Sequence, residues 1–190
     1  MVENVLAHEN SKANQERVAK QSKTEDKQLF PNQTFGKTWS QKIGNEKITL
    51  HYFGAAHTDG DALIHFEHAD IVHMGDLINN RRYPFIDRTA GASIKNWVEV
   101  LEKTTKHFNK KTTFVYGHAS EGFEVYGKVN DIKAMQDYFE KLLAFGETEI
   151  KAGKTKEEFL KNKAIPGVTE WIGGGIERSL TAVYDELTTK

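Results

Sequence analysis

The stretches FGAAHTDGDALIHF (53–66) and HMGDL (73–77) hold the residues that decide the fold of this 190-residue chain. ALIHF and DIVHM have the composition of short β-strands, and the polar turn EHA joins them. His57 and Asp76 each follow small residues, at positions where strand-end loops usually carry binding groups. Two interpretations are open at this point: a metal site, or a polar turn between two strands.

The segment before this stretch predicts further strands. QTFGKTWSQKIGNEKITLHYF (33–53) alternates like a β-hairpin that turns at GNEK. By contrast, residues 11–28 are strongly polar, with little to bury, and indicate a solvated helix or loop.

Beyond Asp76 the pattern becomes mainly helical. Apolar residues recur at helical spacing in 91–108 and again in 130–153, where Asn130 is a suitable N-cap. TKEE from Thr155 to Glu158 matches a capping box, and 173–187 predicts a last helix. With a strand TTFVYGH between the first two helices, the order predicts a layered α/β fold.

Composition limits the possible functions. The length suggests one domain, 1–190, and the 26 basic and 27 acidic residues leave no basic excess, so nucleic acid is not expected as a partner. The absence of cysteine excludes disulfides and thiolate ligands, so any metal must be held by histidine and carboxylate. No apolar run is long enough for a membrane span, and no signal peptide is expected if Met1 is the true start.

A third segment, VYGHA (115–119), places His118 directly after Gly117. Small residues allow the backbone to approach a buried ion closely, and imidazole and carboxylate suit a catalytic divalent metal. A single histidine is far more often a surface or core residue than a ligand. The combination of His57, Asp76 and His118 in this order favours the metal site.

Taken together, GAAHTDGDALIHF, IVHMGDLINNRRYPFID and FVYGHA resemble the metallo-β-lactamase superfamily, in segment order from about Val5 to the C-terminus. The resemblance implies an αββα sandwich with a two-metal site at one edge of the sheets. It implies His57 as a terminal ligand of the first metal and His118 of the second, with Asp76 as the bridging, catalytic carboxylate. The implied cofactor is zinc at both positions, with manganese or iron as alternatives, and the partner is a small-molecule substrate.

One part of that family pattern is missing. The sequence has no His-x-His-x-Asp-His cluster, and His65, His68 and Asp70 have a different spacing that fits a polar hairpin turn. VLAHEN near the start resembles the family segment that follows the cluster. We therefore expect a partial, N-terminally truncated domain in which each metal keeps two ligands, one of them shared.

Other polar residues near the motifs have two possible roles. Asp61 either orients a ligand histidine or caps the turn, whereas Asp59 is expected to be a turn residue. Asn79 and Arg82 are expected to bind an anionic substrate, because guanidinium suits carboxylate and phosphate. Arg81 could reach the same substrate, but a solvated loop is the favoured interpretation for it. The remaining expectations are that Tyr83, Pro84 and Phe85 pack that loop, that Trp97 and Trp171 lie in the core or a subunit contact, and that His51, His73 and His107 are structural or exposed.

The sequence thus predicts a metal-dependent hydrolase that uses metal-activated hydroxide and is impaired in this truncated chain. A lactam, an ester, a thioester, a lactone or a phosphodiester are all possible substrates. The alternatives are a non-catalytic structural or interaction module, or a half-domain completed by another chain. An exposed sheet edge and apolar surface would favour self-association. The sequence leaves the compartment open, because a longer N-terminus could direct export.

Overall fold

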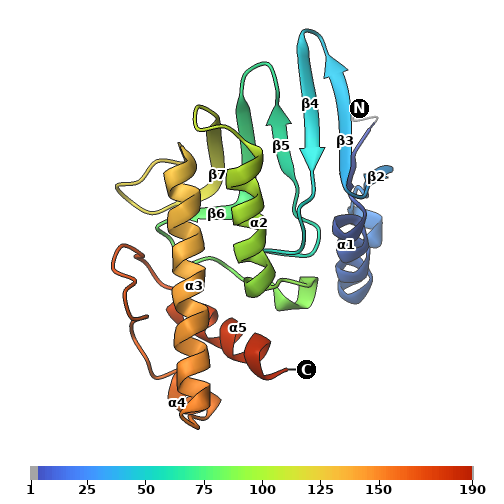
Figure 1. The fold of residues 1–190 in the computed structure, drawn as a ribbon. Coiled ribbons are helices and arrows are strands. Elements are labelled where there is room, and N and C mark those ends of the chain that lie inside the picture. The colour runs from blue at the N-terminus through green and yellow to red at the C-terminus, as the bar shows by residue number, and fades with distance from the viewer. Residues whose placement is uncertain (1–3, 190) are drawn as a thin grey trace.

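A six-stranded mixed sheet forms the centre of the molecule in the computed structural model, which describes residues 4–189. The strands lie in chain order, and all neighbours are antiparallel except β6 and β7, which are parallel. Figure 1 shows this sheet with helices in front of it. The strands are β3 (Thr38–Ile43), β4 (Glu46–His51), β5 (Leu63–Phe66), β6 (Ile71–Asn80), β7 (Thr113–Ala119) and β8 (Tyr126–Gly127).

The predicted hairpins are confirmed. β3 and β4 pair across a turn at Gly44, whose φ of +62° favours glycine. β5 and β6 pair across the turn that contains His68 and Asp70. The Asp70 carboxylate accepts a 2.6 Å hydrogen bond from Thr112 Oγ1 and so fixes this turn to the start of β7.

Helices α2 (Ile94–His107) and α3 (Val129–Lys151) lie on one face of the sheet, and α5 (Ile176–Thr188) packs on α3 below the sheet. Their apolar stripes pack into a single core with the sheet. Trp97 of α2 is fully buried, 4.5 Å from the Phe139 ring centroid of α3. Trp97 therefore joins the helices as expected of a core residue, and its Nε1 also donates to the Leu77 carbonyl of β6.

Two helix starts were predicted with different success. The capping box from Thr155 to Glu158 is confirmed at α4 (Lys156–Phe159). Asn130 as N-cap is wrong, because α3 already begins at Val129 and its N-cap is Lys128, which makes no side-chain cap. Contacts outside the helix hold Lys128 at this position, because its Nζ donates hydrogen bonds to the Lys111 carbonyl and to the Thr113 hydroxyl.

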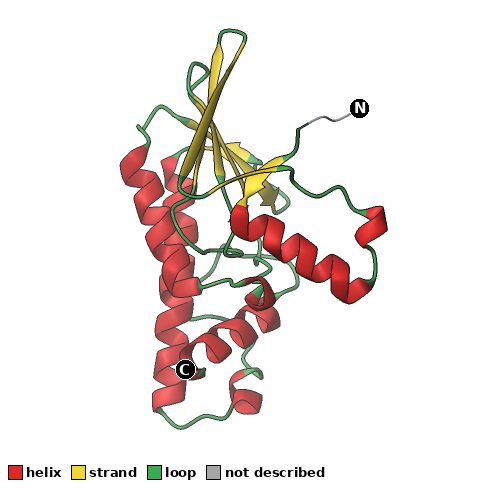
Figure 2. Ribbon diagram, turned by 90° about the vertical axis from the view of Figure 1, so that its right-hand side faces the viewer, coloured by secondary structure: helices red, strands yellow, loops and turns green. Residues whose placement is uncertain are grey.

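The polar segment near the N-terminus forms α1 (Glu9–Ser22), in agreement with the helical alternative. It follows β1 (Leu6–His8), which pairs in parallel with β2 (Gln33–Phe35). Figure 2 shows α1 on the opposite side of the sheet from the main helices. His8 is buried, caps α1 by accepting a hydrogen bond from Asn10 N–H, and stacks on Tyr52 with a centroid distance of 3.9 Å, none of which the sequence analysis predicted.

The sheet face away from the main helices carries mostly apolar side chains. The pairing register runs one row through Trp39, Leu50, Ile64, His73 and Val115. Trp39, Ile64 and Val115 are half-buried, whereas Leu63, Val72 and Phe114 on the other face belong to the buried core. The described residues thus form an α/β structure in which the main helices pack on one face of the large sheet and leave this outer face half-buried.

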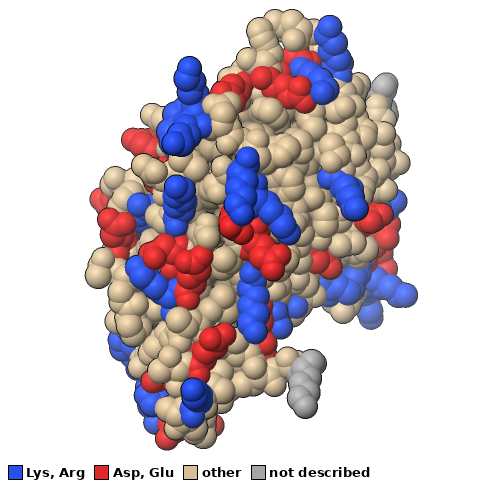
Figure 3. Space-filling view, in the orientation of Figure 1, with Lys and Arg blue, Asp and Glu red and all other residues tan. Residues whose placement is uncertain are grey.

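Charged side chains are interspersed on the helix-covered face, with no large region of one sign in Figure 3. No helix in the stretch 4–189 has both the length and the apolar character needed to cross a membrane.

Candidate metal centre

The three predicted donors converge on one cleft, whose wall also includes Asn79, Arg82, Phe85 and Arg178. His57 lies in the loop between β4 and β5, and His118 lies in β7. The motif suggested that Asp76 would lie at the end of a strand, but Asp76 lies inside β6. The pairing of β6 with β7 is irregular between Gly75 and Asn79, and such an irregularity redirects a side chain from the regular pleat.

Each histidine faces a different oxygen of the Asp76 carboxylate. His57 Nε2 lies 3.8 Å from Oδ2, and His118 Nε2 lies 3.4 Å from Oδ1. Both distances are long for strong hydrogen bonds. Two ligands of one zinc ion, each about 2.0–2.2 Å from it at a tetrahedral angle, lie roughly 3.3–3.5 Å apart. The 3.4 Å spacing on the His118 side falls in this range, and the 3.8 Å spacing on the His57 side is slightly longer than it.

Gly117 makes room for this carboxylate. A Cβ atom at Gly117 would collide with Asp76 Oδ1 and would lie 2.8–2.9 Å from the Gly75 backbone, closer than real Cβ contacts occur. The glycine before His118 therefore allows β7 to approach β6 where Asp76 turns into the cleft.

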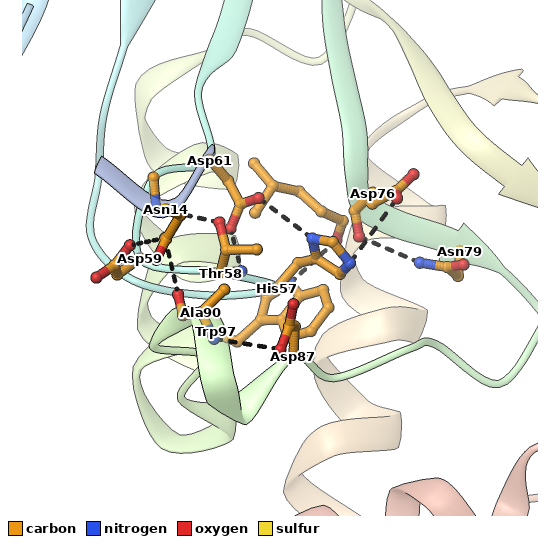
Figure 4. Close-up of polar contacts among 12 residues, drawn as sticks. Asn14, His57, Thr58, Asp59, Asp61, Asp76, Asn79, Asp87, Ala90 and Trp97 are labelled. Atoms are coloured by element: carbon orange, nitrogen blue, oxygen red, sulfur yellow. Dashed lines mark hydrogen bonds and ion pairs between the residues drawn. The ribbon is translucent and has the colours of Figure 1, made fainter. Parts of the chain in front are cut away.

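Asp61 contacts both His57 and the backbone of the turn. Its Oδ1 lies 3.3 Å from His57 Nδ1, and its Oδ2 accepts a 2.6 Å hydrogen bond from the Thr58 backbone. Figure 4 shows His57 between Asp61 and Asp76, with Nε2 directed at the cleft. Burial lowers the pKa of His57, but the hydrogen bond and charge of Asp61, followed by the charge of Asp76, outweigh burial and raise it.

Helix α1 anchors the loop that carries His57. Asn14 donates to Asp59 Oδ1 at 2.8 Å (Figure 4). Asn10 donates to the Asp59 carbonyl at 2.9 Å. Gly60 packs so tightly on α1 that an added Cβ would lie 2.5 Å from Ser11 N. Asp59 is thus more than the expected turn residue. The two asparagines spaced four apart on a polar helix were the sequence signal for this contact.

Arg81 is not in a solvated loop, so that expectation is wrong. Its side chain is 14% exposed and pairs with Asp131 at 3.4 Å and Glu170 at 2.9 Å. Its guanidinium also lies over the rings of Phe123 and Trp171. Arg81 therefore ties together three segments that are distant in sequence, and Trp171 is buried as expected.

The loop after β6 differs in part from expectation. Phe85 does not pack the loop, because 53% of it is exposed and its ring borders the cleft, whereas Tyr83 packs on the core. Asn79 is nearly buried and donates its amide to the Asp76 carbonyl at 3.1 Å. Arg82 is exposed at the cleft wall.

The fit of this cleft to a metal pair is partial. Nitrogen and carboxylate donors have suitable types and spacing, but each ion would have two ligands, and catalytic zinc usually takes three. Within residues 4–189, no group of three or more His, Asp or Glu side chains is arranged to hold one ion. The described chain thus contributes donors without completing either ligand set.

No protein-family model matches the chain, and no curated protein does either. Its structure is similar to a metallo-β-lactamase from Pontibacter korlensis, with a TM-score of 0.57, 18% identity, and coverage of 72% of this chain and 58% of that one. DIM-1 metallo-β-lactamase gives a TM-score of 0.55 at 17% identity, with coverage of 72% and 57%. The inverting sec-alkylsulfatase Pisa1 from Pseudomonas sp. gives 0.62 at 14% identity, with coverage of 83% and 27%.

These likenesses establish the fold. The chain has an α/β structure of the metallo-β-lactamase type over most of its length, as the motifs predicted. It spans somewhat more than half of the two lactamases and 27% of the alkylsulfatase.

Proposed function

We propose that this chain carries part of the two-metal centre of a metallo-hydrolase. His57 and Asp76 hold one divalent ion, and Asp76 and His118 hold the second. The observation that carries the proposal is that each imidazole Nε2 faces a different oxygen of one carboxylate, in a cleft open to small molecules. Zinc is the expected metal, and the same donors accept manganese or iron.

The metal, when bound, supplies a hydroxide nucleophile near neutral pH and polarises the bond to be cleaved. The residues of this chain hold the geometry around it. Asp61 binds His57 Nδ1 and so keeps Nε2 directed at the cleft. Asn79 fixes the irregular part of β6 through the Asp76 carbonyl, and Arg82 faces the substrate.

The ligand count supports a second proposal, namely that a further polypeptide segment or another chain supplies the remaining donors. Two donors per ion make a weak site. Half-buried apolar side chains on the outer sheet face, among them Ile64 and Phe66, are suited to pack against such a segment. On this proposal the isolated chain binds zinc weakly, hydrolyses little and self-associates.

The test is a zinc titration of the EDTA-treated chain by calorimetry, with three donor variants and one control. Asp76→Asn keeps the size of the side chain and should weaken both sites. His57→Ala and His118→Ala should each remove one site and leave the other. His68→Ala is the matched control, because His68 is exposed on the β5–β6 turn, and it should bind zinc like the unmodified chain.

Equal zinc binding by the unmodified chain and Asp76→Asn would contradict the proposal. So would loss of binding in His68→Ala with retention in His57→Ala. Hydrolysis of an ester, a lactam and a phosphodiester is then compared with and without the segment that completes the ligand set, and turnover should require that segment.

A further inference from the structure

Two arginines on the cleft wall have no polar partner among the described residues. Among the five arginines of the chain, Arg17, Arg81 and Arg88 donate hydrogen bonds to carbonyl or carboxylate groups. Within residues 4–189, the side chains of Arg82 and Arg178 make no hydrogen bond or ion pair, and both face the same cleft. Guanidinium groups left free at a cleft are suited to bind an anionic group of a ligand.

Arg82 and Arg178 come from different parts of the chain. Arg82 follows β6, and Arg178 lies in the first turn of α5. A parallel bridge between Arg82 and Ile172 joins the end of β6 to the segment that leads into α5. The two positive charges are thus held on one wall by the fold, although they are 96 positions apart in the sequence.

An apolar cavity of about 260 Å³ adjoins this wall. Phe85 and Arg178 line both the cleft and the cavity, and Ile86, Thr181 and Ala182 line the cavity alone. The exposed Phe85 ring therefore stands at the junction of a polar space and an apolar one.

The acidic groups at the cavity rim are already engaged. Asp87 accepts hydrogen bonds from Thr89, and Asp185 forms an ion pair with Lys156. They therefore compete little with an incoming anion for Arg178.

We propose that the ligand of this cleft is a small amphipathic anion. Its carboxylate, sulfate or phosphate group binds Arg82 and Arg178, and its short alkyl or aryl part crosses Phe85 into the apolar cavity. This inference rests on the proposed function in one respect, namely that the bond to be hydrolysed lies in the cleft that Arg82 and Arg178 line. The anion wall and the apolar cavity exist without metal, so binding can be measured separately.

The test uses the EDTA-treated chain and three probes: sodium hexanoate, sodium acetate and 1-hexanol. Calorimetry or chemical-shift titration should show hexanoate binding more tightly than either of the others, because only hexanoate has both the charge and the chain. Arg82→Gln and Arg178→Gln should each weaken hexanoate binding roughly 10-fold, in line with the loss of a charge-assisted contact. Phe85→Ala should weaken hexanoate binding and leave acetate binding unchanged.

Lys133→Gln is the control for a change in net charge, since Lys133 is exposed on α3, and it should bind hexanoate like the unmodified chain. The inference is overturned if 1-hexanol binds as tightly as hexanoate. It is equally overturned if both arginine variants keep full hexanoate binding. Failure of zinc binding with hexanoate binding intact would count against the metal proposal alone, and the reverse result would count against the anion site alone.

Discussion

Replacing Gly117 with alanine adds one methyl group between β7 and the Asp76 carboxylate. The new Cβ would overlap Asp76 Oδ1 and would lie 2.8 Å and 2.9 Å from the Gly75 carbonyl carbon and oxygen. The carboxylate can rotate away, whereas the Gly75 backbone can move only with β6. We therefore expect overpacking to lower the free energy of unfolding by about 1–3 kcal/mol.

The same methyl group should damage the metal site more than the fold. If Asp76 rotates away, the 3.4 Å and 3.8 Å spacings to the two histidines are lost together. Disturbing the support of a metal ligand typically costs roughly 10–100-fold in affinity. Urea unfolding and zinc calorimetry measure the two effects.

Gly36→Ala is the matched control for Gly117→Ala. An added Cβ at Gly36 meets only Glu9 Oε1 at 3.7 Å, an ordinary contact, so its effect should stay within about 0.5 kcal/mol. The reasoning is refuted if Gly117→Ala resembles Gly36→Ala in both unfolding and zinc affinity.

Three further predictions concern stability. Arg81→Gln should lower the free energy of unfolding by about 2–4 kcal/mol in urea titration, because it leaves the half-buried Asp131 without its cation; no change would show that the pair is not needed. Trp97→Phe should lower the free energy of unfolding by about 2–4 kcal/mol, because it removes ring volume from the core and the hydrogen bond to the Leu77 carbonyl; urea unfolding followed by far-ultraviolet circular dichroism measures the change. Burial, followed by the charges of neighbouring histidines, lowers the pKa of His51 to about 4, so the unfolded chain takes up a proton between about pH 6.5 and 4 that the folded chain does not. Stability should therefore fall as the pH drops through that window, by about 1–2 kcal/mol after allowance for partial exposure, and His51→Phe should flatten the fall in urea titrations at each pH.

The strands and the convergence of His57, Asp76 and His118 could be predicted because their signals are local. Alternation and turn residues mark β4, β5 and β6 within a few positions each. His57, Asp76 and His118 each stand beside small residues, and their order in the chain matches a known arrangement. Such patterns can be identified from the sequence because each depends only on residues within one short segment.

The low exposure of the Arg81 side chain could not be predicted, because its ion-pair partners are far away in the sequence. Asp131 lies 50 positions away and Glu170 lies 89 positions away. Nothing in the neighbourhood RRYPF distinguishes Arg81, which is largely buried, from Arg82, which is exposed. Only the packing of three separate segments makes that distinction.

The predicted start of α3 was wrong for a related reason. Asn130 has the right side chain for an N-cap, but Lys128 is held by the carbonyl of Lys111 and the hydroxyl of Thr113. Those contacts fix the chain before Asn130 and let the helix begin earlier. Capping preference is worth about 1 kcal/mol, so tertiary contacts of similar size can override it.

The central claim is that Asp76 is shared between two metal positions. A crystal of the chain soaked in zinc, with data collected at the zinc absorption edge, tests it directly. The account predicts one anomalous peak between His57 Nε2 and Asp76 Oδ2 and a second between His118 Nε2 and Asp76 Oδ1. Peaks at His65 or His68 with none beside Asp76 would contradict it.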